Sequence, residues 1–245
     1  MIVLVNFADE KMTISQERCT NSAMKNGVDI VWPQNPNTIS HEFKEMNKEI
    51  FKQERGFGYW LWKPYHIYKA MLQMKEGDVL IYSDAGVEII ENVNEIISRM
   101  DEDIFFFCNG HRHIHWCKMD VLMGMGVKEW ILKIGNETFG EHQQVQASVI
   151  FFKVNQKTID FVKEWLLYCQ MPNFIDDSPS KLPNHPEFAE HRHDQAVLTC
   201  LQIKYGYRVH WWADKLWYMG MRDRWPNDTH PPMFLHHRFR NEDYK

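Results

Sequence analysis

The sequence contains no long hydrophobic run. A helix that crosses a bilayer needs about 20 consecutive apolar residues, and the 245-residue chain has no such stretch. The first seven residues, MIVLVNF, also lack the basic segment and the small-residue cleavage site of a secretory leader. We therefore expect no transmembrane segment, interpret the start of the sequence as a strand, and predict a soluble, cytoplasmic protein.

Positive charge is also scarce. Lys and Arg number 28 against 33 Asp and Glu, which gives a formal net charge of -5. A protein that binds nucleic acid along a broad surface needs an excess of basic side chains to neutralise the phosphates. The sequence therefore argues against a nucleic-acid partner, while a local basic pocket remains compatible with it.

Cysteine is too sparse and too irregularly spaced for a disulfide framework. The five cysteines are an odd number without paired spacing: Cys19, Cys108, Cys117, Cys169 and Cys200. This pattern favours reduced thiols over disulfides or a zinc site. Most of these side chains are expected to be small buried hydrophobic groups.

No glycine- or serine-rich linker and no internal repeat divides the sequence, so residues 1–245 are predicted to form one domain. Strand-like and helix-like segments alternate along the chain, and the strand at 103–108 is apolar on both faces. Alternation with buried strands predicts a three-layer α/β sandwich, in which helices flank a mixed, mostly parallel central sheet.

The individual elements are predicted from hydrophobic periodicity and turn residues. Ser40 is expected to cap a helix, and the proline-rich segment 171–186 is expected to be an ordered surface loop. The predicted strands are 2–7, 29–32, 79–83, 103–108, 146–153 and 207–212, and the predicted helices are 10–26, 40–54, 64–75, 93–100, 158–169 and 193–204.

The segment GDVLIYSDAG, residues 77–86, carries the strongest single indication of function. An apolar strand ends there, and Asp84 follows at its carboxyl end, which is where ligands bind in open α/β sheets. A carboxylate at that place can hold a hard divalent cation, which in turn neutralises a phosphate. The alternative is an Asp that only caps a turn or the next helix.

Aromatic residues are abundant, at 14% of the chain with 10 Trp. Four of the rings cluster in RGFGYWLWKPY, residues 55–65, between Arg55 and Lys63. Rings and cations in one segment can line a cleft with stacking faces and phosphate-binding donors. The alternative is an aromatic corner that packs a helix onto the sheet. We favour packing for most of the rings and function for Arg55 and Lys63.

Polar side chains also gather in HRHDQ, residues 191–195, just before an apolar helical pattern. Asp194 could be a simple helix cap. The neighbouring His191 and Gln195 instead favour a polar site, where the carboxylate accepts hydrogen bonds from substrate hydroxyls or acts as a general base.

Two histidine groups complete the candidates. His236 and His237 lie in FLHHRFR near the C-terminus, where an imidazole could bind a metal and Arg238 could pair with phosphate. The segment 111–115, HRHIH, places three imidazoles on alternate positions of one strand. Ligands at such spacing rarely converge on one metal without residues from elsewhere.

Several of these segments, in this order, resemble a group of nucleotide-sugar glycosyltransferases with the GT-A fold. The matching segments are GYWLWKP at 58–64, GDVLIYSDAG at 77–86, WCKMD at 116–120, QASVIFF at 146–152 and HRHDQ at 191–195. Members occur in bacterial polysaccharide clusters and in large DNA viruses that glycosylate their own capsids. The resemblance implies a GT-A-like (Rossmann-like) fold and transfer of a hexosyl or pentosyl group from a nucleotide-sugar donor, with UDP as the expected nucleotide, to a hydroxyl of a glycan or glycoconjugate acceptor.

The resemblance also implies a metal site. SDAG, residues 83–86, stands where GT-A enzymes carry Asp-X-Asp, whose carboxylates bind Mn²⁺ or Mg²⁺ at the donor diphosphate. Here Asp84 is present, while the second carboxylate is replaced by Gly86. His236, His237 or Glu88 would then complete the metal ligands.

Further donor contacts are implied at the matching positions. The end of the first strand would hold the base, Gln146 to Ser148 would face the donor sugar, and Asp194 with Gln195 would lie near the anomeric carbon. The residues assigned to nucleotide and donor binding are Asn6, Phe7, Arg55, Lys63, Asp84, Gln146, Ser148, His191 and Arg238.

Two other functions compete with glycosyl transfer. A glycoside hydrolase also needs paired carboxylates and aromatic platforms, but it has no use for a cation and phosphate site. A non-catalytic or weakly catalytic carbohydrate-binding relative agrees with the aromatic content and with the incomplete Asp-X-Asp motif. Binding of nucleotide and metal together separates the hydrolase from the transferase, and donor hydrolysis separates the binding protein from it.

Overall fold

The computed structural model describes residues 1–128, 143–211, 219–221, 233–237 and 239–244. The strands are β1 (Ile2–Phe7), β2 (Ile30–Gln34), β3 (Val79–Ser83), β4 (Val87–Ile89), β5 (Ile104–Arg112), β6 (Gln143–Lys153), β7 (Val209–Trp211), β8 (Met219–Met221) and β9 (Phe234–His236). The α-helices are α1 (Thr13–Lys25), α2 (His41–Met46), α3 (Lys48–Phe51), α4 (Gly56–Tyr59), α5 (Trp62–Met71), α6 (Asn94–Ile97), α7 (Met119–Gly124), α9 (Gln156–Cys169), α10 (Pro172–Ile175) and α11 (His193–Tyr205). Short 3₁₀ turns are η1 (Pro36–Thr38), η2 (His113–His115) and η3 (Asn241–Tyr244).

The main sheet has six strands in the order β2-β1-β3-β6-β5-β7. β1 pairs in parallel with both β2 and β3, and β5 pairs in parallel with β7. β6 runs antiparallel to both of its neighbours, β3 and β5. The sheet is therefore mixed and mostly parallel, which confirms the predicted α/β class.

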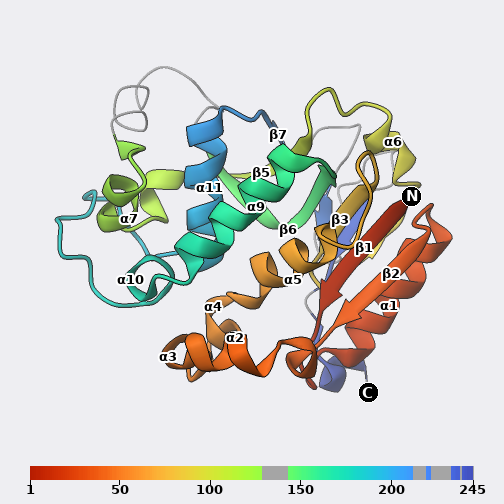
Figure 1. Cartoon of the computed structure of the whole chain (residues 1–245), viewed down its shortest axis with the longest axis horizontal. Helices are drawn as coiled ribbons and strands as arrows, with labels where there is room; N and C mark the ends of the chain where they lie inside the picture. The colour runs from red at the N-terminus through yellow and green to blue at the C-terminus, as the bar shows by residue number, and fades with distance from the viewer. Residues whose placement is uncertain (129–142, 212–218, 222–232, 238, 245) are drawn as a thin grey trace.

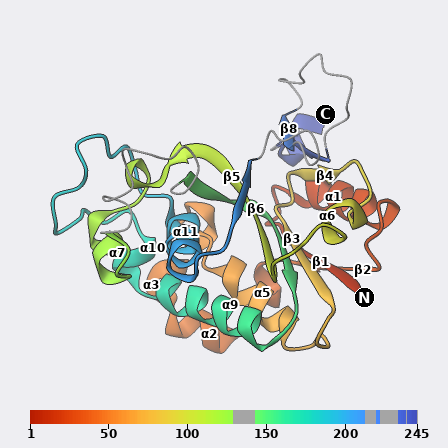
Figure 2. The same cartoon turned by 90° about the horizontal axis from the view of Figure 1, so that it is seen from above.

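Helices and a small sheet cover the two faces of this main sheet (Figures 1 and 2). Alternate side chains of a strand point to opposite faces, so β3 contributes Leu80 and Tyr82 to one core and Ile81 to the other. The first core packs against α5, α9 and α11, and the second packs against α1, α6 and β4. Because both faces of the main sheet are buried, its strands have continuous apolar sequences.

A second sheet, with the order β4-β9-β8, was not expected from the sequence. Its strands have three residues each, too few for a period-2 pattern to stand out. β9 pairs antiparallel with β4, which places His236 opposite Val87. The chain then runs along α1, where the Ser15 hydroxyl donates to the Phe239 carbonyl at 2.6 Å. The pairing of β9 with β4 brings the C-terminal segment close to the loop between β3 and β4, which carries Asp84.

Three predicted segments differ from the structure. The strand expected at 111–115 is wrong, because β5 ends at Arg112 and His113–His115 form η2. The helix expected at 40–54 is two short helices, α2 and α3, because Asn47 closes the first with a non-helical backbone. The cap at Ser40 is confirmed, since its hydroxyl accepts from the Phe43 amide at 3.3 Å.

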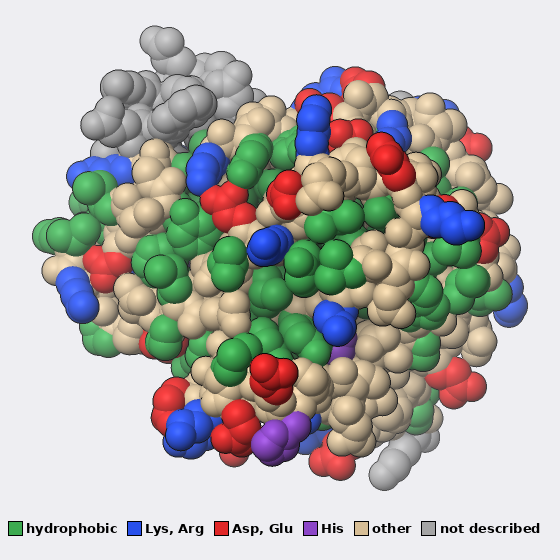
Figure 3. Space-filling model, viewed as in Figure 1, with side chains coloured by type: hydrophobic (Ala, Val, Ile, Leu, Met, Phe, Trp, Pro, Cys, Tyr) green, Lys and Arg blue, Asp and Glu red, His purple; other side chains and the backbone are tan. Residues whose placement is uncertain are grey.

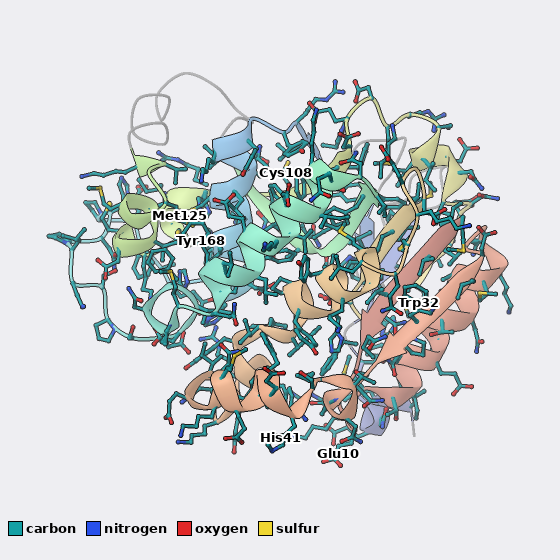
Figure 4. The ribbon with its side chains drawn as sticks, viewed as in Figure 1. Glu10, Trp32, His41, Cys108, Met125 and Tyr168 are labelled. Carbon is teal, nitrogen blue, oxygen red and sulfur yellow. The ribbon has the colours of Figure 1, made fainter. Side chains whose placement is uncertain are left out.

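The segment 171–186 is not wholly loop, because it begins with α10. Tyr168 of α9, labelled in Figure 4, stacks on Phe174 of α10 with ring centroids 5.7 Å apart. Packing against α9 therefore stabilises a turn of helix in a sequence whose prolines predict a loop.

None of the described helices is both long and apolar enough to cross a membrane. On the face shown in Figure 3, basic and acidic side chains are interspersed and do not gather into a patch of one sign.

Candidate active site

Lys63 lies at the centre of the candidate site. Its ammonium nitrogen is 3.2 Å from Asp194 Oδ2 and 3.4 Å from Asp84 Oδ1, and it donates to the Ala147 carbonyl at 3.0 Å. The lysine side chain is 4% exposed. Burial lowers the pKa of Lys63, but attraction from Asp194 and Asp84 outweighs it and leaves the pKa raised. Lys63 is therefore a buried cation that joins the two carboxylates singled out from the sequence.

Asp84 lies at the carboxyl end of β3, as predicted, with its side chain 39% exposed. Its Oδ1 accepts a hydrogen bond from the Tyr82 hydroxyl at 2.6 Å, and its amide donates to the Ser148 carbonyl at 2.8 Å. Within the described chain, the buried Ser148 hydroxyl has no hydrogen-bond partner. The Asp84 carboxylate is thus held by Tyr82 on one side and open to solvent on the other. It lies beside the Ser148 hydroxyl, which has no partner among the described residues.

Asp194 differs from Asp84 in its environment. Its side chain is 5% exposed, and it lies inside the first turn of α11, whose N-cap is Arg192. The helix-cap interpretation is therefore wrong. Burial raises the pKa of Asp194 to about 6, against the lowering effect of Lys63. A carboxyl group with such a pKa can exchange a proton near neutral pH, as a general base must.

Gln195 connects α11 to β6. Its side-chain oxygen accepts from the Ala147 amide at 3.2 Å, and its side-chain nitrogen donates to Gln144 Oε1 at 2.7 Å. Gln146 is half-buried on the same strand. Asp194, Gln195 and the strand expected to face the donor sugar therefore form one connected group.

The segment before Lys63 forms a left-handed turn. Five successive residues have positive φ: Gly56 (+59°), Phe57 (+50°), Gly58 (+82°), Tyr59 (+52°) and Trp60 (+63°). Left-handed backbone costs about 1–2 kcal/mol for each residue that carries a Cβ. The Trp62 indole nitrogen donates to the Gly56 carbonyl at 2.9 Å and so holds the turn closed.

The strained backbone is concentrated at one place. In the described part of the chain, the non-glycine residues with positive φ are Phe57, Tyr59, Trp60 and His193. His193 stacks on Tyr59 with ring centroids 4.9 Å apart and lies 5.3 Å from the Trp60 ring. Strain of this kind persists where the surrounding structure imposes it and is found mostly at functional sites. Here it fixes the turn that leads into α5, which carries Lys63, and the residue directly before Asp194.

Arg55 lies at the outer end of the left-handed turn. Its guanidinium contacts Asp177 at 3.2 Å and Glu190 at 3.1 Å, and its side chain is 43% exposed. A hollow of about 450 Å³ lies alongside, and Asp177 and Glu190 form part of its lining. Asp177 is also 3.6 Å from His193 Nε2. This hollow thus adjoins the residue that precedes Asp194.

His191 has a structural environment. Its Nε2 donates to the Phe174 carbonyl at 2.8 Å, and its Nδ1 accepts from the Lys118 amide at 3.3 Å. Burial lowers its pKa well below the usual range, so the ring is neutral. Both ring nitrogens are engaged by backbone groups, and its assignment to donor binding stays a prediction.

The two residues expected near the base are both buried. The Asn6 amide bonds toward α1, to Thr20 at 3.3 Å and to Gln16 at 3.0 Å. Phe7 points to the opposite face of the sheet and stacks on Trp62 with centroids 3.8 Å apart. Their assignment to base binding is untested by these contacts, and Arg238 lies outside the described residues.

The backbone of His236 and His237 lies close to the loop that carries Asp84. The His237 amide donates to the Gly86 carbonyl at 3.0 Å, and its Nε2 is 3.7 Å from Glu88 Oε1. The Arg18 Nε also donates a hydrogen bond to Glu88 Oε1 at 2.8 Å. Among described residues, the clusters of three metal-binding side chains do not include Asp84. The fit to a divalent ion is partial: Asp84 offers an accessible oxygen, while the imidazoles come from His236, at the end of β9, and His237, which directly follows it.

Tyr82 and Gln144 belong to the site but were missed from the sequence. Tyr82 is two residues before Asp84 and therefore shares its face of β3, and its ring lies 5.1 Å from the Lys63 nitrogen. That spacing was a usable signal. Gln144 receives hydrogen bonds from Gln195 and Asn109 across long sequence separations, so no local pattern indicates it.

The chain matches no protein-family model and no curated protein. Among solved structures, the bifunctional glycosyltransferase WbbM superposes with a TM-score of 0.54 at 11% identity, over 97% of this chain. The chain spans only 45% of the length of that protein. Mouse xyloside xylosyltransferase 1 superposes with a TM-score of 0.51 at 10% identity, over 97% of this chain and 98% of the mouse protein.

Both of these solved structures are glycosyltransferases. The chain therefore has the GT-A-type glycosyltransferase fold that its motifs predict. At these identities the likeness establishes the fold, and the activity has to be argued from the site.

Proposed function

We propose that this protein is a metal-dependent glycosyltransferase that moves a sugar from a nucleotide-sugar donor, with UDP as the expected nucleotide, to a hydroxyl of a glycan acceptor. The observation that carries the proposal is the buried Lys63 between Asp84 and Asp194, at the carboxyl end of β3 in a glycosyltransferase fold. Ligands bind at this edge of open α/β sheets.

The electrostatics of the site suit cleavage of a sugar–diphosphate bond. Negative charge develops on the leaving phosphate, and positive charge develops on the anomeric carbon. Lys63 supplies a fixed positive charge for the leaving phosphate. Asp194 supplies a carboxylate that either stabilises the anomeric carbon or accepts the proton of the acceptor hydroxyl. Because these groups are buried, their charges are less screened than they would be in water.

Mn²⁺ or Mg²⁺ would be held at Asp84, with His236 or His237 as further ligands. When bound, such an ion neutralises charge on the donor diphosphate. Asp84 is suited to this role because its inner oxygen is fixed by Tyr82, while the side chain remains 39% exposed. The single carboxylate leads us to expect that the ion binds much more tightly with the diphosphate than alone.

The acceptor is assigned to the hollow beside Asp177 and Glu190. This hollow has a mixed polar and apolar lining, and Asp177 in that lining is 3.6 Å from His193, the residue before Asp194. The Asp194 side chain is 5% exposed and is not among the described lining residues, so an acceptor hydroxyl has to reach it past His193. Hydroxyl, amide and carboxylate groups along its lining can bind sugar hydroxyls.

The test is a binding screen of nucleoside diphosphates with and without Mn²⁺, read by thermal shift and then by calorimetry. We expect stabilisation by a single nucleotide class that depends on the metal, since a ligand that binds the folded state raises its stability. Asp84→Ala should abolish the metal-dependent part of the affinity.

Asp78→Ala is the matched control, because Asp78 lies at the opposite end of β3 and pairs with the N-terminus at 3.1 Å. It should leave nucleotide binding intact. Unchanged metal-dependent affinity in Asp84→Ala would contradict the role of Asp84.

A non-catalytic relative that only binds nucleotide sugars is the second function to test, since Gly86 replaces a carboxylate of the family motif. Slow release of free sugar from the donor, measured without acceptor, supports the transferase. Donor binding with no hydrolysis and no transfer to any glycan supports the binding protein.

A further inference from the structure

A buried cluster of one histidine and two cysteines lies away from the Lys63 site. It consists of His113 in η2, Cys117 just before α7, and Cys200 in α11. His113 Nε2 is 3.3 Å from Cys200 Sγ, and the two sulfur atoms are 4.0 Å apart. The ligand atoms of all three side chains lie within 4.8 Å of one another. The sequence predicts no zinc site here because these residues are separated by up to 87 positions.

All three residues are withdrawn from solvent. His113 and Cys200 are 0% exposed, and Cys117 is 2% exposed. Within the described chain, His113 Nδ1 has no hydrogen-bond partner, so the polar contact of this imidazole is with a thiol. Thiols are weak hydrogen-bond partners, and a buried imidazole with so little compensation is costly. The packing of a hydrophobic core alone does not explain why an imidazole should be placed here.

The geometry suits a metal ion. Zn–S bonds of about 2.3 Å and Zn–N bonds of about 2.0–2.1 Å place neighbouring ligand atoms about 3.5–3.8 Å apart in a tetrahedron. The observed separations of 3.3 and 4.0 Å fall on either side of that range. Thiolate and imidazole are the ligands that soft and borderline metals select.

We propose that His113, Cys117 and Cys200 form a buried site for a single thiophilic metal ion, Zn²⁺ or Cu⁺. The three side chains suffice for three-coordinate Cu⁺, whereas Zn²⁺ would add a water molecule as its fourth ligand. Binding forms two metal–sulfur bonds and one metal–nitrogen bond, and each thiol releases its proton to solvent.

The site would join two parts of the fold that hold the candidate active site. Cys200 lies on α11, the helix whose first turn carries Asp194 and Gln195. His113 directly follows β5, which pairs with β6. An ion between them would fix α11 against the main sheet. This role is structural and does not depend on which reaction the protein catalyses.

A second cluster, His115, His185 and Glu187, is a useful comparison. Glu187 is 61% exposed, and its Oε2 already lies 2.8 Å from His115 and 3.6 Å from Arg112. Ion pairing accounts for that arrangement, so we make no metal assignment there. It does supply a half-buried histidine, His185, as a control for the experiment.

The test uses the full chain, purified under reducing conditions without added metal, and measures bound Zn and Cu by mass spectrometry. We expect stoichiometric metal that survives dialysis. After removal of the metal, Co²⁺ should produce a thiolate-to-cobalt charge-transfer band, and Zn²⁺ or Cu⁺ should raise the melting temperature. Competition by a Cu⁺-specific chelator identifies which ion is held.

Cys117→Ser, Cys200→Ser and His113→Gln should each lose the stoichiometric metal and the cobalt band. Cys169→Ser removes a buried cysteine outside the cluster and should retain both, as should His185→Ala. Circular dichroism identifies the variants that fold, and the conservative His113→Gln keeps the test decisive if a cysteine variant does not. Absence of metal and of the cobalt band in the wild-type chain, or binding that persists in folded His113→Gln, would overturn the proposal.

Discussion

Lys63 is a residue whose role follows from its neighbours. A buried ammonium is unfavourable unless it is paired, and here carboxylates lie on two sides of it. Removing either partner leaves the lysine with the other, so each aspartate can be tested without leaving the cation alone. Asp84 and Asp194 can therefore be assigned separate functions by substitution.

Asp194→Asn is expected to lower turnover by about 100-fold or more, which corresponds to roughly 3 kcal/mol, the loss seen when one charged or hydrogen-bonding group is removed from a transition state. Asparagine keeps the shape of the side chain, and Lys63 keeps Asp84 as its partner. Nucleotide affinity, measured by calorimetry, should remain close to wild type. Near-normal turnover would show that Asp194 has only a structural role.

The rate should also depend on pH through the same residue. Burial raises the pKa of Asp194 to about 6, so its carboxylate form is lost as the pH falls through that value. If the carboxylate is the active form, kcat rises with pH and levels off above about 6. A kcat profile under saturating donor, flat from pH 5 to 7.5, would argue against a role for the ionised group.

At the scale of elements, the left-handed turn at 56–60 positions both Lys63 and His193. Its glycines are required by contact as well as by φ. A Cβ at Gly58 would lie 2.9 Å from the Phe51 ring and 3.2 Å from the Ile50 carbonyl, whereas a Cβ at Gly77 would meet nothing within 4 Å. Both residues have similar φ, +82° and +85°.

This pair gives a matched test of the turn. Gly77→Ala should cost about 1 kcal/mol of unfolding free energy, from the left-handed backbone alone. Gly58→Ala should cost at least about 1 kcal/mol more, because the added methyl group displaces packed atoms. Denaturant unfolding measures both, and only Gly58→Ala should also impair turnover. Equal losses of stability would show that the turn relaxes easily.

The whole molecule should lose stability in acid through its buried histidines. Burial lowers the pKa of His66 to about 3, and it also lowers the pKa values of His191 and His193. The unfolded chain binds protons at these imidazoles from about pH 6.5 downward, whereas the folded chain does not. Stability is therefore fully present above pH 6.5 and falls below it, by up to about 1.4 kcal/mol per pH unit for each histidine.

Unfolding by urea at pH 7, 6 and 5 measures this slope. His66→Leu should reduce it, because one of the buried imidazoles is removed. His41→Gln, at an exposed position, should leave it unchanged. An identical slope in wild type and His66→Leu would mean that His66 binds its proton in the folded state.

Much of the fold was accessible from local pattern. The bounds of β1 and β3 agree with their predicted ranges, because apolar runs between turn residues define buried strands. The short strands β4, β8 and β9 were missed, since three residues carry too little periodicity. The break at Asn47 was missed for a similar reason: the apolar spacing on both sides continues through it.

The sequence by itself determined the kinds of residues at the candidate site and their order, because a carboxylate after a buried strand and a cation beside glycines are visible as local patterns. Only the tertiary structure decided that Lys63 lies between Asp84 and Asp194, that Tyr82 holds Asp84, and that a histidine and two cysteines meet in the core. These contacts join residues from separate strands and helices. Their distances depend on how those elements pack, and local sequence carries no record of that packing.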